Sequence, residues 1–393
     1  MTKRNLSRTA ILVGTLIAGA AGAQARQLEV RFWPEGKVYP NVIVEGGLFD
    51  CNIQNMAVIN RAGKTVTLEQ CQIRLLNNGQ VTQDLYIPLG KIVQHFGGFH
   101  GNYARGALTA WEPEFQLKRL FQNATMVGTL KLGNNEGVSL RDRYFQFNGT
   151  VDTLQMIFSG KAEDGSPVQS SAQLAVEVYR SKTDLILPLK GTWNVGNGPY
   201  PYVTHRWVNH QEFGYDFIKV DGEGNVCKTD SSGMEEYYSY GEEIIAPADG
   251  VIFSIRNNGS DAPLLNDAIM KPAEFQRKIQ AYRDSLLGAG GYNEMFGNYI
   301  AIDHGTGEYS ILVHVKKGSV RVKKGDKVRQ GDVLGLVGNS GLSNVPHLHY
   351  ELVNDPDRMV GRGLPLRFSN LNDQPGSRVL RFGEFVRNAR PAK

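Results

Sequence analysis

Short stretches in which apolar and polar residues alternate recur between Gln27 and about Lys182, and they restrict the fold more than any other feature of the sequence. Examples are "LEVRFW", "TVTLEQCQIRLL", "TLQMIFSG" and "QLAVEVYR", which are separated by turn sequences such as Asn77-Asn78-Gly79. Alternation with a period of two is typical of strands that are buried on one face. Because many short strands with polar turns indicate an antiparallel sandwich, we expect a β-sandwich-like domain over residues 26–182.

Two segments with several glycines are interpreted as a loop and as a connector between domains. The segment "QHFGGFHGNY" is expected to be a glycine-rich loop with solvated histidines, His95 and His100. The segment "LPLKGTWNVGNGPYPY", residues 187–202, is rich in glycine and proline and is expected to connect to a second domain.

Residues 183–393 also have the sequence pattern of a β domain. Strand-like runs with glycine at their turns include "EIIAPADGVIFSI", "NYIAIDHG", "YSILVHV" and "HLHYELV". One helix is predicted between the first two runs, from about Lys271 to Leu287, because Pro272 stands at its start and glycines follow it. The predicted fold is therefore mainly β: a sandwich-like domain followed by an antiparallel β domain with one inserted helix.

The first 25 residues contain the three regions of a secretory signal peptide in their usual order. Basic residues at positions 3, 4 and 8 precede an apolar run from Ala10 to Ala21, and the small-residue pattern Ala23-Gln24-Ala25 follows. The run is too short to span a bilayer, and no later segment resembles a membrane helix. We therefore expect an exported protein without a membrane span.

The net charge of the chain bears on whether a nucleic acid partner is expected. Residues 1–25 contain three basic and no acidic residues, so without them the formal net charge falls from +4 to +1. A charge so close to zero does not indicate a nucleic acid partner.

Export permits disulfides, and the chain has three cysteines. Cys51 and Cys71 flank a predicted strand-turn-strand segment, so they either form a bridge that leaves Cys227 unpaired, or all three stay reduced.

The segment "PHLHYEL" places two histidines, His347 and His349, one residue apart after Pro346. In a strand they project from the same face, whereas Tyr350 and Leu352 face the core on the other side. Two imidazoles on one face can share a reaction centre: one binds a metal and its neighbour reaches the water on that metal.

A second candidate element is "NHQEFGYDFIKV", in which Asp216 follows His210 by six residues. A carboxylate at the start of an apolar stretch is costly to bury unless it is paired or bound to a cation. One histidine here, Asp216 and one histidine of the pair would supply three nitrogen and oxygen ligands, which leaves the fourth position open as in catalytic zinc sites. His205 is the alternative ligand if His210 points away.

A third element is His314 in "YSILVHV", where it shares a strand face with Leu312. The domain already offers three candidate ligands and a second histidine. We therefore assign His314 to the site and not to the core. His304, in "IDHGTG", is expected to support a turn.

Residues from about 200 to 355 resemble the LytM-type, lysostaphin-like zinc metallopeptidases of the M23 class. The resemblance rests on "PHLHYEL", on "IIAPADGVI", on "GNYIAIDHGTGEYSILVHV" and on "VKKGDKVRQGDVLGLVGNSG". It implies an antiparallel β peptidase domain of the LytM type in residues 183–393. It does not extend to the N-terminal 180 residues.

The resemblance also implies roles for five residues. His210, Asp216 and His349 would bind Zn²⁺, whereas His347 and His314 would orient water and stabilise the oxyanion. The spacing of six from His210 to Asp216 departs from the common HxxxD motif. Zinc would lower the pKa of its bound water and polarise the scissile carbonyl.

Taken together, the sequence predicts an exported zinc metalloendopeptidase, periplasmic or extracellular and associated with the cell wall, that hydrolyses peptide cross-links of bacterial peptidoglycan. One alternative is a catalytically silent LytM-like module that binds cell wall and regulates another hydrolase, although such modules usually lose ligands. A carrier module is disfavoured, since the hairpin "VKKGDKVRQGDVLG" occurs behind a signal peptide.

Overall fold

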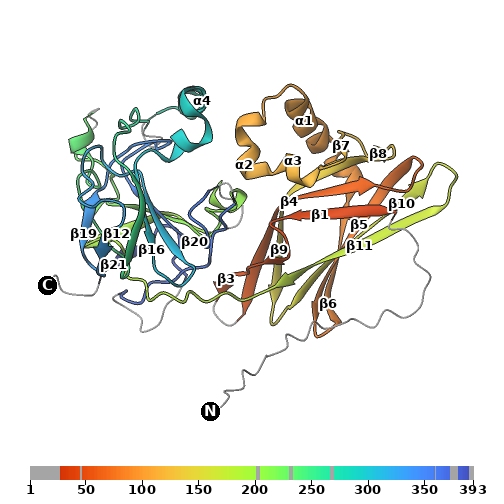
Figure 1. The fold of residues 1–393 in the computed structure, drawn as a ribbon, viewed down its shortest axis with the longest axis horizontal. Coiled ribbons are helices and arrows are strands. Elements are labelled where there is room, and N and C mark those ends of the chain that lie inside the picture. The colour runs from red at the N-terminus through yellow and green to blue at the C-terminus, as the bar shows by residue number, and fades with distance from the viewer. Residues whose placement is uncertain are drawn as a thin grey trace, which may run out of the picture.

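The chain folds into two β-rich parts, which lie side by side and are joined by an extended linker (Figure 1). The structure is a computed structural model that describes residues 27–44, 47–200, 204–229, 233–265, 270–358, 360–371 and 379–388. The predicted signal peptide, residues 1–25, lies outside these ranges. Within them, no helix combines the length and the apolar character needed to cross a membrane. The prediction of a mainly β fold is confirmed.

The N-terminal part is a sandwich of two sheets. The first has the order β1-β4-β9-β7, with β3 paired to β4, and consists of β1 (Leu28–Trp33), β3 (Asn41–Val44), β4 (Leu48–Asn60), β7 (Thr125–Met126) and β9 (Glu136–Asn148). The second has the order β2-β11-β10-β5-β6, with β8 paired to β5, and consists of β2 (Lys37–Val38), β5 (Val66–Asn77), β6 (Gln80–Pro88), β8 (Lys131–Leu132), β10 (Thr153–Ala162) and β11 (Pro167–Val176). Side chains from both sheets form one buried core.

Two of the three cysteines lie in that core. Cys51 on β4 and Cys71 on β5 belong to opposite sheets, and both are buried. All three cysteines are among the described residues, and none of them forms a disulfide. Of the two alternatives, the structure shows the reduced one.

A group of short helices lies between β6 and β7: η1 (Leu89–Ile92), α1 (Val93–Ala104), η2 (Thr109–Trp111), α2 (Glu112–Phe115) and α3 (Leu117–Leu120). The prediction of a glycine-rich loop here is wrong, because α1 contains "QHFGGFHGNY". Each glycine in a helix interior costs about 1 kcal/mol. Packing offsets this cost, since the rings of Phe99 and Phe115 lie 5.3 Å apart and join a cluster with Ile59 of β4.

The C-terminal part contains one large sheet with the order β18-β15-β16-β17-β20-β13-β12-β21 and a two-stranded sheet, β14-β19. Its strands are β12 (Thr192–Asn197), β13 (Tyr215–Ile218), β14 (Glu243–Ile245), β15 (Gly250–Arg256), β16 (Tyr299–Asp303), β17 (Tyr309–Val313), β18 (Lys327–Val328), β19 (Val333–Leu336), β20 (Leu348–Val353) and β21 (Phe385–Arg387). Neighbouring strands of the large sheet pair antiparallel, and Tyr350 and Leu352 of β20 face the buried core as predicted. The short elements η3 (Thr204–Trp207) and η4 (Met234–Glu236) lie in its loops.

The predicted inserted helix is α4 (Pro272–Gly290), which is followed by η5 (Gly291–Phe296). No residue of α4 is buried. In contrast, Tyr292, Met295 and Phe296 of η5 are buried in a cluster with side chains of β16 and β17. The insertion is therefore an exposed helix that η5 anchors to the sheet.

A buried carboxylate fixes the linker between the two parts. Glu308, just before β17, is fully buried and accepts hydrogen bonds from the hydroxyl of Tyr179 and from the backbone N–H groups of Lys182 and Thr183 at 2.7 and 2.9 Å. Burial alone would raise the pKa of Glu308, but these hydrogen bonds lower it below its ordinary value. The carboxylate is therefore charged in the folded protein.

We expect Glu308→Ala to lower the free energy of unfolding by about 1–3 kcal/mol, because it leaves buried donors without an acceptor. Urea denaturation at pH 7 measures the difference. Glu274→Ala is the control, since it removes only an exposed pair with Lys278 and is expected to cost less than about 0.5 kcal/mol. Equal effects of the two substitutions would contradict the anchoring role of Glu308.

The lowered pKa of Glu308 also predicts a pH dependence. A carboxyl whose pKa is lower in the folded state contributes stability above its unfolded pKa, ordinarily 4.5, and loses that contribution as the pH falls through its folded pKa. The stability advantage of the wild type over Glu308→Gln is therefore expected to shrink as denaturation is measured below pH 4.5. If the stability difference between the wild type and Glu308→Gln grew as the pH fell, the lowered pKa of Glu308 would be ruled out.

Candidate metal centre

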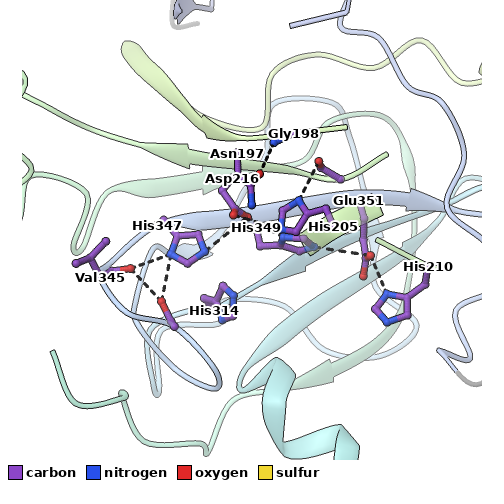
Figure 2. Close-up of polar contacts among 12 residues, drawn as sticks. Asn197, Gly198, His205, His210, Asp216, His314, Val345, His347, His349 and Glu351 are labelled. Carbon is purple, nitrogen blue, oxygen red and sulfur yellow. Dashed lines mark hydrogen bonds and ion pairs between the residues drawn. The ribbon is translucent and has the colours of Figure 1, made fainter. Parts of the chain in front are cut away.

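The pairing of β13 with β20 places a carboxylate beside a histidine. Asp216 and His349 are direct partners in this antiparallel pair, and Asp216 Oδ1 lies 2.8 Å from His349 Nδ1. His347, just before β20, extends from the same side, with its Nε2 3.6 Å from Asp216 Oδ1. The structure thus brings together the three residues that the sequence assigned to this face (Figure 2).

The third side chain at this position is His205. It lies on η3, and its Nε2 is 3.3 Å from Asp216 Oδ2. Its Nδ1 lies 3.2 Å from the Gly214 carbonyl oxygen, which accepts the Nδ1 proton and leaves the Nε2 lone pair directed at the cluster. One potential ligand atom from each of His205, Asp216 and His349 lies within 4.8 Å of the others.

His210, which the sequence assigns to the ligand set, does not join this cluster. Its Nδ1 lies 3.0 Å from Glu351 Oε2, and its Nε2 lies 3.2 Å from the Tyr292 hydroxyl. The chain turns between η3 and β13, so that His205 faces Asp216 while His210 lies on the far side of Glu351 (Figure 2). The alternative ligand, His205, occupies the position that the sequence had assigned to His210.

Glu351 is a site residue that the sequence reasoning missed. It is fully buried on β20, and its Oε2 lies 3.7 Å from His349 Nε2. The signal was present, because Glu351 follows His349 by two residues and so lies on the same face of the strand. Burial alone would raise the pKa of Glu351, but attraction from His210 and His349 and the hydrogen bond with His210 lower it below the ordinary value.

This donor set fits a metal cation. His349 Nε2 is buried and has no hydrogen-bond partner within the described part of the chain. A histidine that binds a metal through Nδ1 carries its proton on Nε2, where a carboxylate commonly accepts it, and Glu351 stands at that position. Burial opposes a positive charge here, yet Asp216 and Glu351 raise the pKa of His349 to about 9. The two carboxylates therefore favour positive charge at this point, and a bound cation would supply it.

His347 and His314 lie beside the cluster, with their ring centroids 4.6 Å apart. His347 Nδ1 donates to the Val345 carbonyl at 2.8 Å, and His314 Nδ1 donates to the Ser340 carbonyl at 2.7 Å. These contacts leave both Nε2 atoms as acceptors. Burial lowers the pKa of both histidines, so both rings are neutral at neutral pH.

His314 differs from its predicted position in one respect. The strand β17 ends at Val313, and His314 follows it with a φ of 64°. A left-handed conformation costs a residue other than glycine about 1–3 kcal/mol, and such residues are concentrated at functional sites. This backbone conformation turns the ring toward His347.

Comparisons with known proteins find one matching family and several partial relatives. The sequence pattern described as "Peptidase family M23" matches residues 265–360, which include His314, His347 and His349. The chain is 47% identical over 57 residues to the peptidoglycan DD-endopeptidase ShyA of Vibrio cholerae, 34% identical over 89 residues to the DD-carboxypeptidase/endopeptidase Mpg of Neisseria meningitidis, and 50% identical over 56 residues to an uncharacterised metalloprotease of Buchnera aphidicola. These segments cover 14%, 22% and 14% of this chain, and 13%, 20% and 14% of the respective relatives.

Solved structures that match part of this chain include the catalytic domain of lysostaphin from Staphylococcus simulans, at 18% identity and a TM-score of 0.24, with 44% of this chain and 86% of that chain covered. A zinc-containing peptidase from Vibrio cholerae, at 15% identity and a TM-score of 0.24, is matched over 86% of this chain and 84% of that chain. The predicted resemblance is confirmed by the match of the peptidase family M23 model to residues 265–360.

Proposed function

We propose that this protein is an exported zinc metalloendopeptidase, periplasmic or associated with the cell wall, that hydrolyses peptide cross-links of peptidoglycan. One observation carries the proposal: His205, Asp216 and His349 bring ligand atoms within 4.8 Å of one another, beside two neutral histidines. This arrangement supports the proposal because it offers candidates for both parts of a metallopeptidase site, a ligand set and acid-base groups.

The ligand set suits zinc. Two imidazole nitrogens and one carboxylate are common zinc ligands, and three protein ligands leave a position for water or substrate. When bound, zinc would polarise the scissile carbonyl and activate a water molecule. His205 Nε2, Asp216 and His349 Nδ1 would hold the ion, and Glu351 would accept the His349 Nε2 proton.

His347 and His314 would handle protons and charge. Because carbonyl groups accept their Nδ1 protons, each Nε2 can take a proton from water and later return it to the leaving amine. After protonation, the same Nε2–H groups can donate to the oxyanion that develops on the substrate. Both roles require the rings to keep their present tautomer and orientation.

The substrate class is supported by relatives. Three proteins of Vibrio cholerae that match this chain in part are named peptidoglycan DD-endopeptidases, and each match covers at most 21% of the relative. The sequence of residues 1–25 supports export to the compartment where peptidoglycan lies.

Metal binding by single variants tests the ligand assignment. We expect His205→Ala to weaken zinc binding more than about 100-fold, because a ligand is lost. His210→Gln changes a residue that contacts Glu351 and none of the ligand atoms, so its effect is expected to stay at about 10-fold, the lower end of the range for groups behind the ligands. Competition with a chromophoric chelator measures both affinities. Stronger weakening by His210→Gln than by His205→Ala would reverse the assignment.

Muropeptide cleavage tests the activity. The zinc-loaded wild type is expected to release products from cross-linked muropeptides, chelation to abolish this activity, and added zinc to restore it. His347→Ala is expected to keep its zinc and to lower kcat about 10²–10⁴-fold, the usual contribution of a general acid-base group. A wild type that binds zinc but cleaves nothing would instead favour the silent regulatory module.

A further inference from the structure

The residue next to the first candidate ligand is held by the N-terminal sandwich. Arg206 follows His205 on η3 and is completely buried. Its guanidinium donates at 3.0 Å to Glu212 of its own part and at 3.0 Å to Asp50 on β4 of the sandwich. A buried charge is stable only when it is paired, so the position of η3 depends on Asp50.

A second contact from the same strand holds the backbone of η3. The side-chain amide of Asn52 on β4 donates a hydrogen bond to the Arg206 carbonyl, and both groups are buried. Asp50 and Asn52 are two residues apart, so they project from the same face of β4. The sandwich therefore holds both the side chain and the backbone of the residue beside His205.

The other histidine ligand also connects to the N-terminal part. His349 faces Glu351, which binds His210, and His210 contacts the hydroxyl of Tyr292. That hydroxyl is in turn hydrogen-bonded to Glu114 of α2. The ring of Trp111, on η2, packs edge-on against Tyr292 at 6.4 Å.

We propose that the N-terminal sandwich completes the zinc site, with Asp50 and Asn52 acting as positioning residues that hold His205 in its ligand orientation. This inference rests on the proposed zinc site. It assigns the sandwich a role in metal affinity, in addition to any contact with the cell wall.

Zinc affinity of full-length variants tests the proposal. We expect Asn52→Ala and Asp50→Asn each to weaken zinc binding about 10-fold or more, as loss of a group that orients a ligand does. Asn60→Ala is the matched control, because Asn60 is a buried asparagine on the same strand whose amide donates to carbonyls of its own part, at Lys64, Leu132 and Gly133. It is expected to lower stability without changing zinc affinity. Chelator competition gives the affinities, and the visible absorption of bound Co²⁺ reports the ligand geometry.

The outcomes separate this inference from the proposed function. Weaker zinc binding and an altered Co²⁺ spectrum in the Asn52 and Asp50 variants, but not in Asn60→Ala, would support it. Affinities within twofold of wild type in all variants, or equal weakening in all three, would overturn the inference and leave the zinc site in place. A wild type that binds no zinc would overturn the proposed function and the inference together. Asn52→Ala removes no charge, so it keeps the test decisive if Asp50→Asn does not fold.

Discussion

The contact between Asp216 and His349 is the interaction on which the rest of the site depends. It joins directly paired residues of two neighbouring strands. It also places a carboxylate that is only 15% exposed where it needs partners of positive charge or hydrogen-bond donors. Burial would raise the pKa of Asp216, but attraction from His205 and hydrogen bonds from His205 and His349 lower it well below the ordinary range. The carboxylate therefore stays charged, and His205, His347 and His349 all lie with a ring nitrogen close to it.

Strand geometry explains why much of this site could be predicted from the sequence. Alternation in a strand places His347 and His349 on one face, and the cost of burying Asp216 indicates that it must be paired. His205 could not be chosen over His210 in the same way. That choice depends on the turn of η3, which Asp50 holds from 156 residues away in the sequence. The spacing in the sequence contains no information about this distant contact.

In the fold, too, some elements follow from the local sequence pattern, whereas others depend on contacts between residues far apart in the sequence. Alternating segments predicted the two sheets of the sandwich, because period-two patterning reports directly which face is buried. The helix α1 was missed, since its glycines disfavour a helix locally. Its stability comes from packing of Phe99 against Phe115, with the Arg141 guanidinium 3.9 Å from the Phe115 ring centroid. Glu351 was overlooked for a different reason: the alternation that selected His349 was not followed two residues further.

The most direct test of the zinc site is a zinc-edge anomalous diffraction map from crystals of the zinc-bound protein. We expect a single peak in contact with His205 Nε2, Asp216 and His349 Nδ1, with Glu351 facing His349 Nε2 and no contact to His210. A peak bound to His210, or no peak between β13 and β20, would contradict it.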